Sequence, residues 1–229
     1  MPRTRSPTRA TEIVNAAITL FMRRGYAATR MEMIAEEAGV APGTLYLYTA
    51  GKEALFDLAL QAAFGGARVD PEDGPHELPE RSSVIEAAWA LVQERARFPL
   101  LEAAAALPEV EDVGAEFERV VLEVYDWLAR YWRGIRMVER CALEWPELST
   151  FFYRGLRRGG LVRLEQYLAG RAAEGRLRSM PDATVAARIV LETASFFAMH
   201  RHTAPDSDGL DVPATRETVL AVLRSAFVP

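Results

Sequence analysis

The stretch of sequence that most constrains the fold is residues 29–55, TRMEMIAEEAGVAPGTLYLYTAGKEAL. It predicts two short helices joined by a tight turn, followed by the start of a third helix. Thr29 is a good N-cap and Glu32 can complete a capping box, so the first helix is expected to begin near Arg30. Gly39 follows the last apolar residue at helical spacing, where a left-handed glycine ends a helix without steric cost. The stretch therefore favours a sharp helical corner.

The second helix of this corner is expected from Pro42 to Tyr48, because proline suits the first position of a helix. Two turns of helix are not stable alone, so neighbouring helices must hold it. Its outward face is expected to present the hydroxyl groups of Thr44, Tyr46 and Tyr48, with the ammonium of Lys52 nearby. Such groups bind phosphate oxygens, which predicts a surface that contacts DNA. A helical hairpin whose tyrosines only cover a core is the alternative.

The residues around the corner extend the pattern in both directions. They are Leu20, Phe21, Gly25, Tyr26, Ala28, Thr29, Ile34, Ala35, Ala38, Gly39, Val40, Gly43, Thr44, Leu45, Tyr46, Tyr48, Lys52, Glu53, Ala54 and Leu55. With them, residues 8–55 resemble the N-terminal helix-turn-helix domain of the tetracycline-repressor (TetR) family of transcriptional regulators. Two positions differ from the family pattern. Ala41 stands where Ser or Thr usually caps the helix, which costs about 1 kcal/mol, and Thr49 stands where an aromatic residue usually anchors the helix end.

The resemblance implies an all-α regulator with a DNA-binding head at residues 1–51 and an effector-binding and dimerisation domain at residues 52–229, connected by a helix over 52–64. The residues expected at the DNA are Arg30, Pro42, Gly43, Thr44, Tyr46, Leu47, Tyr48 and Lys52. It also implies a homodimer on a palindromic operator, since two heads about 34 Å apart read successive major grooves. The dimer is expected to form through helices over 148–174 and 183–201 as a four-helix bundle. Packing within one subunit explains the small residues of these helices equally well.

Charge is distributed unevenly along this chain of 229 residues. Residues 1–55 hold seven basic and five acidic residues, whereas the whole chain has a net charge of −5, so the remainder is strongly acidic. This places the nucleic-acid-binding surface at the N-terminal end. Arg3, Arg5 and Arg9 are expected either to form an arm that reaches the minor groove or to be a solvated tail.

The rest of the chain has helical periodicity, and no alternation typical of strands appears. Helices are expected over 82–98, 100–107, 113–134, 137–144, 148–174, 183–201 and 213–227. Residues 70–80 form a loop rich in proline, glycine and acidic residues, in which His76 is expected to be solvated. The helix over 52–64 is apolar on most sides. It is therefore expected to be covered by two bodies and to transmit an effector-induced shift that changes the separation of the two heads.

Aromatic side chains are frequent in the middle helices. Such residues are more often core than pocket, but the resemblance implies an effector cavity among these helices. The residues expected to line it are Trp89, Phe117, Tyr125, Trp132, Met137, Cys141 and Phe152. Their chemistry suits an apolar effector that is aromatic or cationic. No cofactor is expected.

Other function classes find little support in the sequence. No motif of a nucleotide-binding or hydrolytic enzyme is present, so the chain is expected not to be an enzyme. His200 and His202 point apart on a helix, and the single cysteine, Cys141, excludes an intrachain disulfide. With no membrane span or signal sequence expected, the protein is placed in the cytoplasm. The alternative function is a helical module that uses the N-terminal hairpin to bind a protein.

Overall fold

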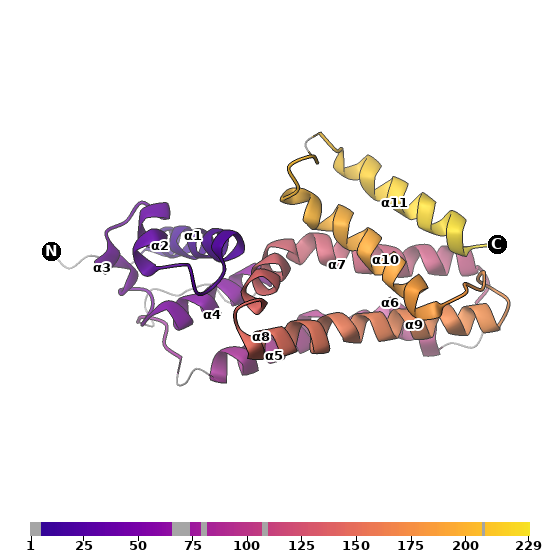
Figure 1. Ribbon diagram of the computed structural model, residues 1–229, viewed down its shortest axis with the longest axis horizontal. Helices are drawn as coiled ribbons and strands as arrows, with labels where there is room; N and C mark the ends of the chain where they lie inside the picture. Colours follow the sequence, from indigo (N-terminus) through magenta and orange to yellow (C-terminus); the bar gives the residue numbers. More distant parts are fainter. Residues whose placement is uncertain (1–5, 66–73, 79–81, 107–109, 208) are drawn as a thin grey trace. The chain divides into compact units, whose positions relative to one another are not determined.

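The computed structural model describes residues 6–65, 74–78, 82–106, 110–207 and 209–229, in which all the regular elements are helices. The elements are α1 (Pro7–Arg24), α2 (Met31–Glu37), α3 (Pro42–Leu45), α4 (Lys52–Ala63), α5 (Ser82–Arg95), α6 (Pro99–Ala106), α7 (Val113–Ala142), α8 (Pro146–Ser149), the π-helix η2 (Thr150–Arg157), α9 (Arg158–Ala173), α10 (Ala183–Ala198), the 3₁₀ helix η3 (His200–His202) and α11 (Val212–Phe227) (Figure 1). The described ranges contain no strand, only one isolated β-bridge. The expected all-α class is confirmed.

Packing divides the chain into two units. Unit 1 comprises Met1–Arg95 and Arg133–Arg154, and unit 2 comprises Ala96–Trp132 and Gly155–Pro229. This division differs from the expected functional boundary after residue 51, because α4 packs along α1 and α5 within unit 1. In the second half of the chain, the two points at which the backbone passes from one unit to the other lie at or next to irregular helical stretches. One is Tyr131 in α7, which has φ −108° and ψ 16°, and the other is η2.

The core of unit 1 is built around an aromatic cluster. The ring of Phe21 on α1 lies 5.1 Å from that of Phe56 on α4, edge to face. Tyr26 stacks on Phe21, and Trp145, just before α8, contacts both Tyr26 and Phe56. Such pairs stabilise by about 0.5–1.5 kcal/mol each beyond their buried area. The cluster therefore joins α1, α4 and the start of α8.

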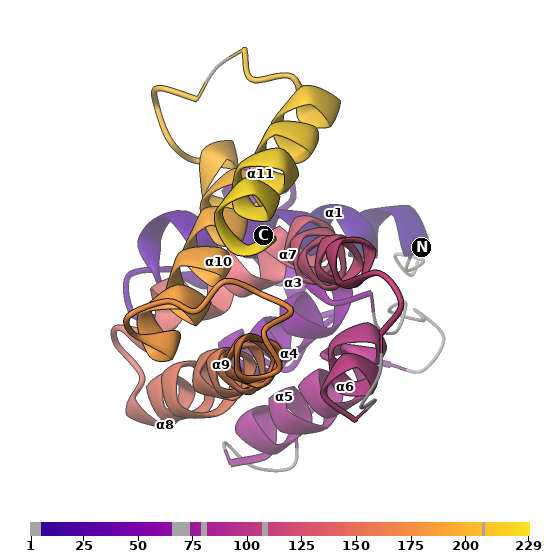
Figure 2. The ribbon, with the colours of Figure 1, turned by 90° about the vertical axis from the view of Figure 1, so that its right-hand side faces the viewer.

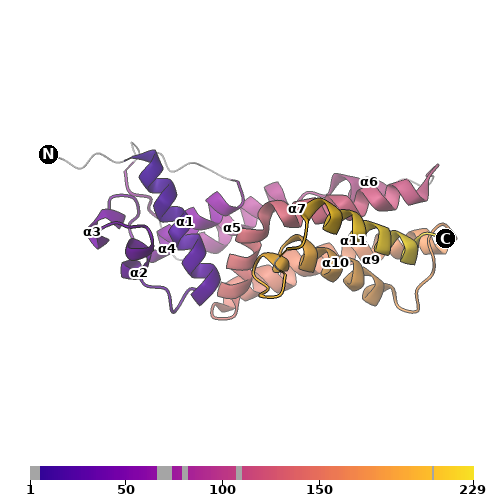
Figure 3. The same cartoon turned by 90° about the horizontal axis from the view of Figure 1, so that it is seen from above.

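Unit 2 is a bundle of α6, the first part of α7, α9, α10 and α11. Figure 2 looks roughly along α7 and α9 and shows α6 and α10 on different sides of α9, while Figure 3 shows α11 beside α10. A buried ion pair crosses this bundle, because the guanidinium of Arg171 on α9 donates two hydrogen bonds to Glu116 on α7. Arg171 also donates to Glu174 and to the carbonyl of Ala104 on α6. Three helices are thus linked through one side chain.

Two expected helix boundaries were wrong. The separate helices predicted over 113–134 and 137–144 form one helix, α7, because Gly134 does not end it. Its bare α-carbon instead makes room for Phe64, whose ring carbon would lie 2.6 Å from an added Cβ. The helix predicted over 148–174 consists of α8, η2 and α9 in succession. Within the described ranges, no helix combines the length and the apolar character that crossing a membrane requires.

Candidate nucleic-acid interface

The corner between α2 and α3 has the geometry that the sequence predicts. Gly39 adopts φ +64°, the left-handed conformation that glycine takes without strain. The amide of Val40 donates to the carbonyl of Ala35 at 2.9 Å, and the amide of Gly39 donates to Glu36 at 3.0 Å. These two bonds satisfy the terminal carbonyls of α2 as a Schellman motif. The turn therefore fixes the direction in which α3 leaves α2.

The predicted capping box at the start of α2 was wrong. The helix begins at Met31, its N-cap residue is Arg30, and no side chain forms a capping hydrogen bond. The side chain of Thr29 is fully buried, and its hydroxyl donates to the carbonyl of Gly25 at 2.6 Å. Glu32 remains in the first turn, where its charge favours the helix dipole. Thr29 thus closes the loop between α1 and α2 rather than capping α2.

Helix α3, which the resemblance predicts to be the recognition helix, has one buried and one open face. Leu45 is fully buried and anchors the helix, whereas the side chain of Tyr46 is 53% exposed. Regular helix ends at Leu45, and a hydrogen-bonded turn continues through Tyr48, which is shorter than the expected helix to Tyr48. Thr44 is half-buried, while Pro42 is exposed. The outward face of α3 therefore presents Tyr46 and the first residues of the helix.

Gly43 is the most informative residue of this face. It has no positive φ that would require glycine, and a Cβ added to it would meet no atom of the described chain within 4 Å. Glycine in a helix costs roughly 0.5–1 kcal/mol relative to alanine. Nothing within the described structure makes use of the missing side chain. The bare backbone at Gly43 therefore suits close approach by another molecule.

The sequence predicts that Tyr48 presents its hydroxyl outward, but the structure shows the side chain turned inward. The residue is only 4% exposed, and its phenolic oxygen accepts a hydrogen bond from the backbone amide of Ser6 at 2.9 Å. Ser6 is the N-cap residue of α1. Tyr48 therefore fixes the start of α1 against the end of α3, because it satisfies an amide that the helix leaves unpaired.

A groove of about 380 Å³ lies between the start of α1 and the recognition helix. It is lined by Ser6, Arg9, Gly39, Val40, Ala41, Thr44, Leu47 and Tyr48. Arg9, in the first turns of α1, carries a guanidinium that pairs with Glu12 at 2.6 Å and remains 44% exposed. The sequence indicated Arg9 only as part of an N-terminal arm, and Arg3 and Arg5 lie outside the described residues. The fold thus adds an exposed cation to the face of α3.

The other expected phosphate ligands are differently placed. The Nζ atom of Lys52 lies 4.3 Å from the centre of the Tyr26 ring and donates to the carbonyl of Ala27 at 3.4 Å. Burial lowers the pKa of Lys52 from its ordinary value. The ammonium is therefore directed to the loop between α1 and α2. Arg30, by contrast, is exposed at the start of α2.

The residues expected to line an effector cavity fall in both units. In unit 1, Met137 and Cys141 are fully buried in the core, and the thiol of Cys141 lies 3.8 Å from the carbonyl oxygen of Phe21. Trp89 is 36% exposed and packs edge-to-face on Phe151. Phe152, also buried, packs against Tyr153.

In unit 2, Phe117 packs against Phe227 of α11 in the core. The hydroxyl of Tyr125 donates to the carbonyl of Phe197 at 3.3 Å, and Trp132 stacks on His202 at 4.5 Å. The fold thus brings each of these three residues into contact with a residue far away in the sequence. The three partners are different, so the contacts do not form one cluster.

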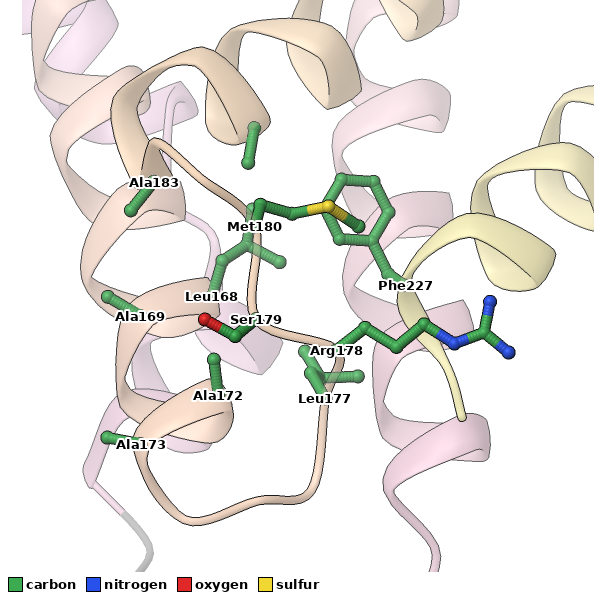
Figure 4. Close-up of a pocket in the computed structure, with 11 residues that line it drawn as sticks. Leu168, Ala169, Ala172, Ala173, Leu177, Arg178, Ser179, Met180, Ala183 and Phe227 are labelled. Atoms are coloured by element: carbon green, nitrogen blue, oxygen red, sulfur yellow. The ribbon is translucent and has the colours of Figure 1, made fainter.

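The described part of unit 2 contains a pocket of about 260 Å³ between α9, α10 and the end of α11 (Figure 4). The alanines of α9 lie on one side of it and Phe227 on the other, with Met180 extending between them. The full lining is Leu168, Ala169, Ala172, Ala173, Leu177, Arg178, Ser179, Met180, Ala183, Ala186 and Phe227. None of the seven residues expected at the effector lines this pocket. Aromatic content did not identify it, because most of its lining is alanine and leucine.

Comparison with known proteins agrees with this geometry. The model of the family described as "Bacterial regulatory proteins, tetR family" matches residues 13–59. The uncharacterized HTH-type transcriptional regulator YfiR of Bacillus subtilis (strain 168) is 27% identical over 151 residues, which is 66% of this chain and 65% of that protein. The chain thus spans just under two thirds of the length of this relative.

Two solved structures share the fold over nearly the whole chain. The ketosteroid transcriptional regulator KstR2 of Mycobacterium tuberculosis superposes with a TM-score of 0.60 and 15% identity, over 99% of this chain and 98% of that one. The transcriptional regulatory protein RHA5900 superposes with a TM-score of 0.62 and 20% identity, over 95% and 97% of the two chains. Together with the helix-turn-helix corner and the family match over residues 13–59, they show that the chain has the all-α fold of such regulators and that its N-terminal segment is similar to the TetR family.

Proposed function

We propose that this protein is a homodimeric TetR-type repressor that binds a palindromic operator and is released from it by a small apolar or aromatic effector. The observation that carries the proposal is the open face of α3. There Gly43 exposes backbone that the described chain does not use, and Tyr46 projects beside it. Backbone amides and hydroxyl groups at a helix start are common partners of DNA phosphates.

The proposed DNA contacts follow from this face. They are Arg9, Arg30, Pro42, Gly43, Thr44, Tyr46 and Leu47, with Lys52 at the margin. Tyr48 is assigned a supporting role, because its phenolic oxygen holds the amide of Ser6. In this arrangement the groove between α1 and α3 receives a phosphate, with the guanidinium of Arg9 as its charged partner.

The proposed dimer uses an exposed apolar face of α10. Val185, Ile189 and Phe196 are 52%, 50% and 41% exposed. Their spacings of four and seven residues place them on one side of the helix. Large apolar side chains gathered on one exposed face favour an interaction surface over scattered exposure. A second copy of α10 would cover them across a two-fold axis.

The outer surface of α9 supports the same interface. Gly159, Gly160 and Gly170 lie within this helix, and a Cβ added to any of them would meet nothing within 4 Å in the described chain. Ala169 and Ala173 on the same helix are exposed. A glycine inside a helix lowers its stability. Because these glycines have no packing role within the described chain, their presence favours close packing against a helix of another molecule. We assign that role to the partner subunit.

The effector is proposed to act on the connecting helix α4. Residues Ala54 to Leu60 of this helix are all buried, so a shift of α4 must displace its neighbours α1 and α5. A small change in the angle of each head would alter the head separation that a palindrome requires. The kink at Tyr131 and the π-helix η2 support such adjustment, because irregular helical turns are frequent at functional sites and hinges.

Selection of binding sites from genomic fragments tests the proposal directly. The purified protein is incubated with the fragments, and the retained fragments are sequenced and compared for a shared palindrome. Affinity for that sequence should fall steeply as salt rises, because phosphate contacts release counterions. The absence of salt-sensitive DNA retention would exclude the regulator and favour the protein-binding module. Operator affinity that stays constant at verified saturation with a ligand would exclude the release step for that ligand.

A further inference from the structure

A short segment outside the helix-turn-helix is bonded to the end of the recognition helix. Residues 74–78, hereafter the strap, follow α4 in the chain and return to the turn after α3. The amide of His76 donates to the carbonyl of Tyr48, and the amide of Ala50 donates to the carbonyl of His76, both at 2.9 Å. Thr49 lies between these two bonds and forms a parallel β-bridge with His76. The strap thus pairs with the backbone where α3 ends.

The side chain of His76 fastens the strap to α4. Its Nε2 atom lies 2.7 Å from Oδ2 of Asp57, a residue of α4 that is 1% exposed. The amide of Gln61 donates to the same oxygen at 2.6 Å, and Oδ1 has no hydrogen-bond partner among the described residues. A buried carboxylate is costly unless donors compensate it, so Asp57 favours the bound position of His76. The expectation of a solvated His76 was therefore wrong.

These contacts join the strap, the turn after α3 and helix α4. They supply support that α3 cannot provide for itself. The helix has only four residues and depends on tertiary contacts for its stability. Its inner side is anchored by Leu45, and the turn after its C-terminal end leads to the small residue Thr49, which is fully buried at the bridge to the strap. The bonds to His76 tie this end to α4. A displacement of α3 would move Gly43 and Tyr46 together, because Gly43 lies within this short helix and Tyr46 is its C-cap residue.

We infer that His76 is a positioning residue for operator binding, which acts by holding the strap between the end of α3 and Asp57. The inference rests on the proposed function, since it concerns the placement of the same recognition helix. In this role the strap limits the movement of α3. His76 itself makes no contact with DNA in this account.

Three variants of the full-length protein test this role. His76→Ala removes the bond to Asp57, His76→Gln keeps a side-chain amide that can donate to the same carboxylate, and Glu77→Gln alters an exposed neighbour in the strap. Operator affinity is measured by fluorescence anisotropy on the selected site. We expect His76→Ala to bind about tenfold more weakly, equivalent to about 1.4 kcal/mol. His76→Gln should recover most of this loss, and Glu77→Gln should bind like the parent protein.

Hydrogen exchange supplies a second readout, because Ala50 donates its amide to the strap. Exchange of a peptide covering residues 45–55 should accelerate in His76→Ala and stay slow in His76→Gln. Unchanged operator affinity and exchange in His76→Ala would overturn the inference while leaving the proposed function intact. Equal loss of binding in the alanine and glutamine variants, with equally lowered melting temperatures, would also overturn it. If the parent protein binds no operator at all, the proposed function fails first.

Discussion

Replacing Gly43 by alanine separates the stability of the recognition helix from its use. The added Cβ would meet no described atom within 4 Å, and the residue has no positive φ, so the folded chain accepts it without strain. Alanine is favoured over glycine in a helix by up to about 1 kcal/mol. We therefore expect Gly43→Ala to raise the free energy of unfolding slightly. The smallest change expected in the free energy of unfolding is close to zero, because α3 has only four residues.

Operator binding should change in the opposite direction. If the backbone of α3 lies against DNA, a methyl group at Gly43 separates the two surfaces, and forced overpacking costs about 1–3 kcal/mol per site. A dimer contains two such sites. Even about 1 kcal/mol at each head would weaken operator binding about thirtyfold in total. If the variant is more stable but binds the operator less tightly, loss of folded protein cannot account for the weaker binding.

The assay combines urea unfolding at fixed protein concentration with anisotropy on the selected operator. Gly39→Ala serves as a matched control, since it adds the same methyl group into equally open space. There the backbone has φ +64°, so the substitution should destabilise the protein by roughly 1–2 kcal/mol. Tight operator binding by Gly43→Ala, or a loss of stability in that variant, would refute the reasoning about its surface.

Three further predictions concern the rest of the chain. Ile189→Glu should convert the dimer to monomers, because it places charge in the apolar face of α10, and a dimeric mass by light scattering would contradict this. Arg171→Met should lower the free energy of unfolding by about 3–5 kcal/mol, since it leaves Glu116 buried without its donors, and adding Glu116→Leu should restore most of it in urea titrations. Burial raises the pKa of Cys141 to about 12, so its thiol should resist alkylation in the folded protein. The stability linked to this proton is complete below the ordinary value of 9.0 and is lost as pH rises toward the folded value, which pH-dependent unfolding measures.

Local sequence rules worked well where the chain interacts with its near neighbours. Gly39 takes the predicted left-handed turn, and Pro42 begins α3 as expected. Both depend on backbone preferences that act over a few residues. The same rules were misleading at Gly134, where the packing of Phe64 keeps a glycine inside a continuous helix.

Side-chain partners distant in the sequence were the main source of error. Tyr48 was predicted to face outward, but the backbone amide of Ser6, 42 residues earlier, donates a hydrogen bond to its phenolic oxygen and holds the side chain inward. His76 was predicted to be solvated from its polar loop, but Asp57 on α4 supplies a buried carboxylate. Neither partner has a fixed spacing from its residue, so no periodicity could reveal it.

The effector region also depends on tertiary packing. The seven residues predicted to line a cavity were chosen for aromatic or sulfur-containing side chains, and they pack in two units against different partners. The pocket of unit 2 is lined largely by alanines and leucines that the sequence also places in an ordinary core. Whether a cavity forms depends on how helices cross, because the same apolar residues can fill a space or surround one.

The sequence by itself determined the all-α class, the helix-turn-helix corner and the basic N-terminal end, because helical periodicity, glycine and proline conformations and charge are properties of short segments. Only the tertiary structure decided that Tyr48 supports α1, that His76 fastens the strap, and that Gly43 lies on an open surface. Those outcomes require atoms far apart in the chain to lie within a few ångströms of one another, or to leave space between them. Burial and hydrogen bonding across the folded head, rather than any local preference, set those distances.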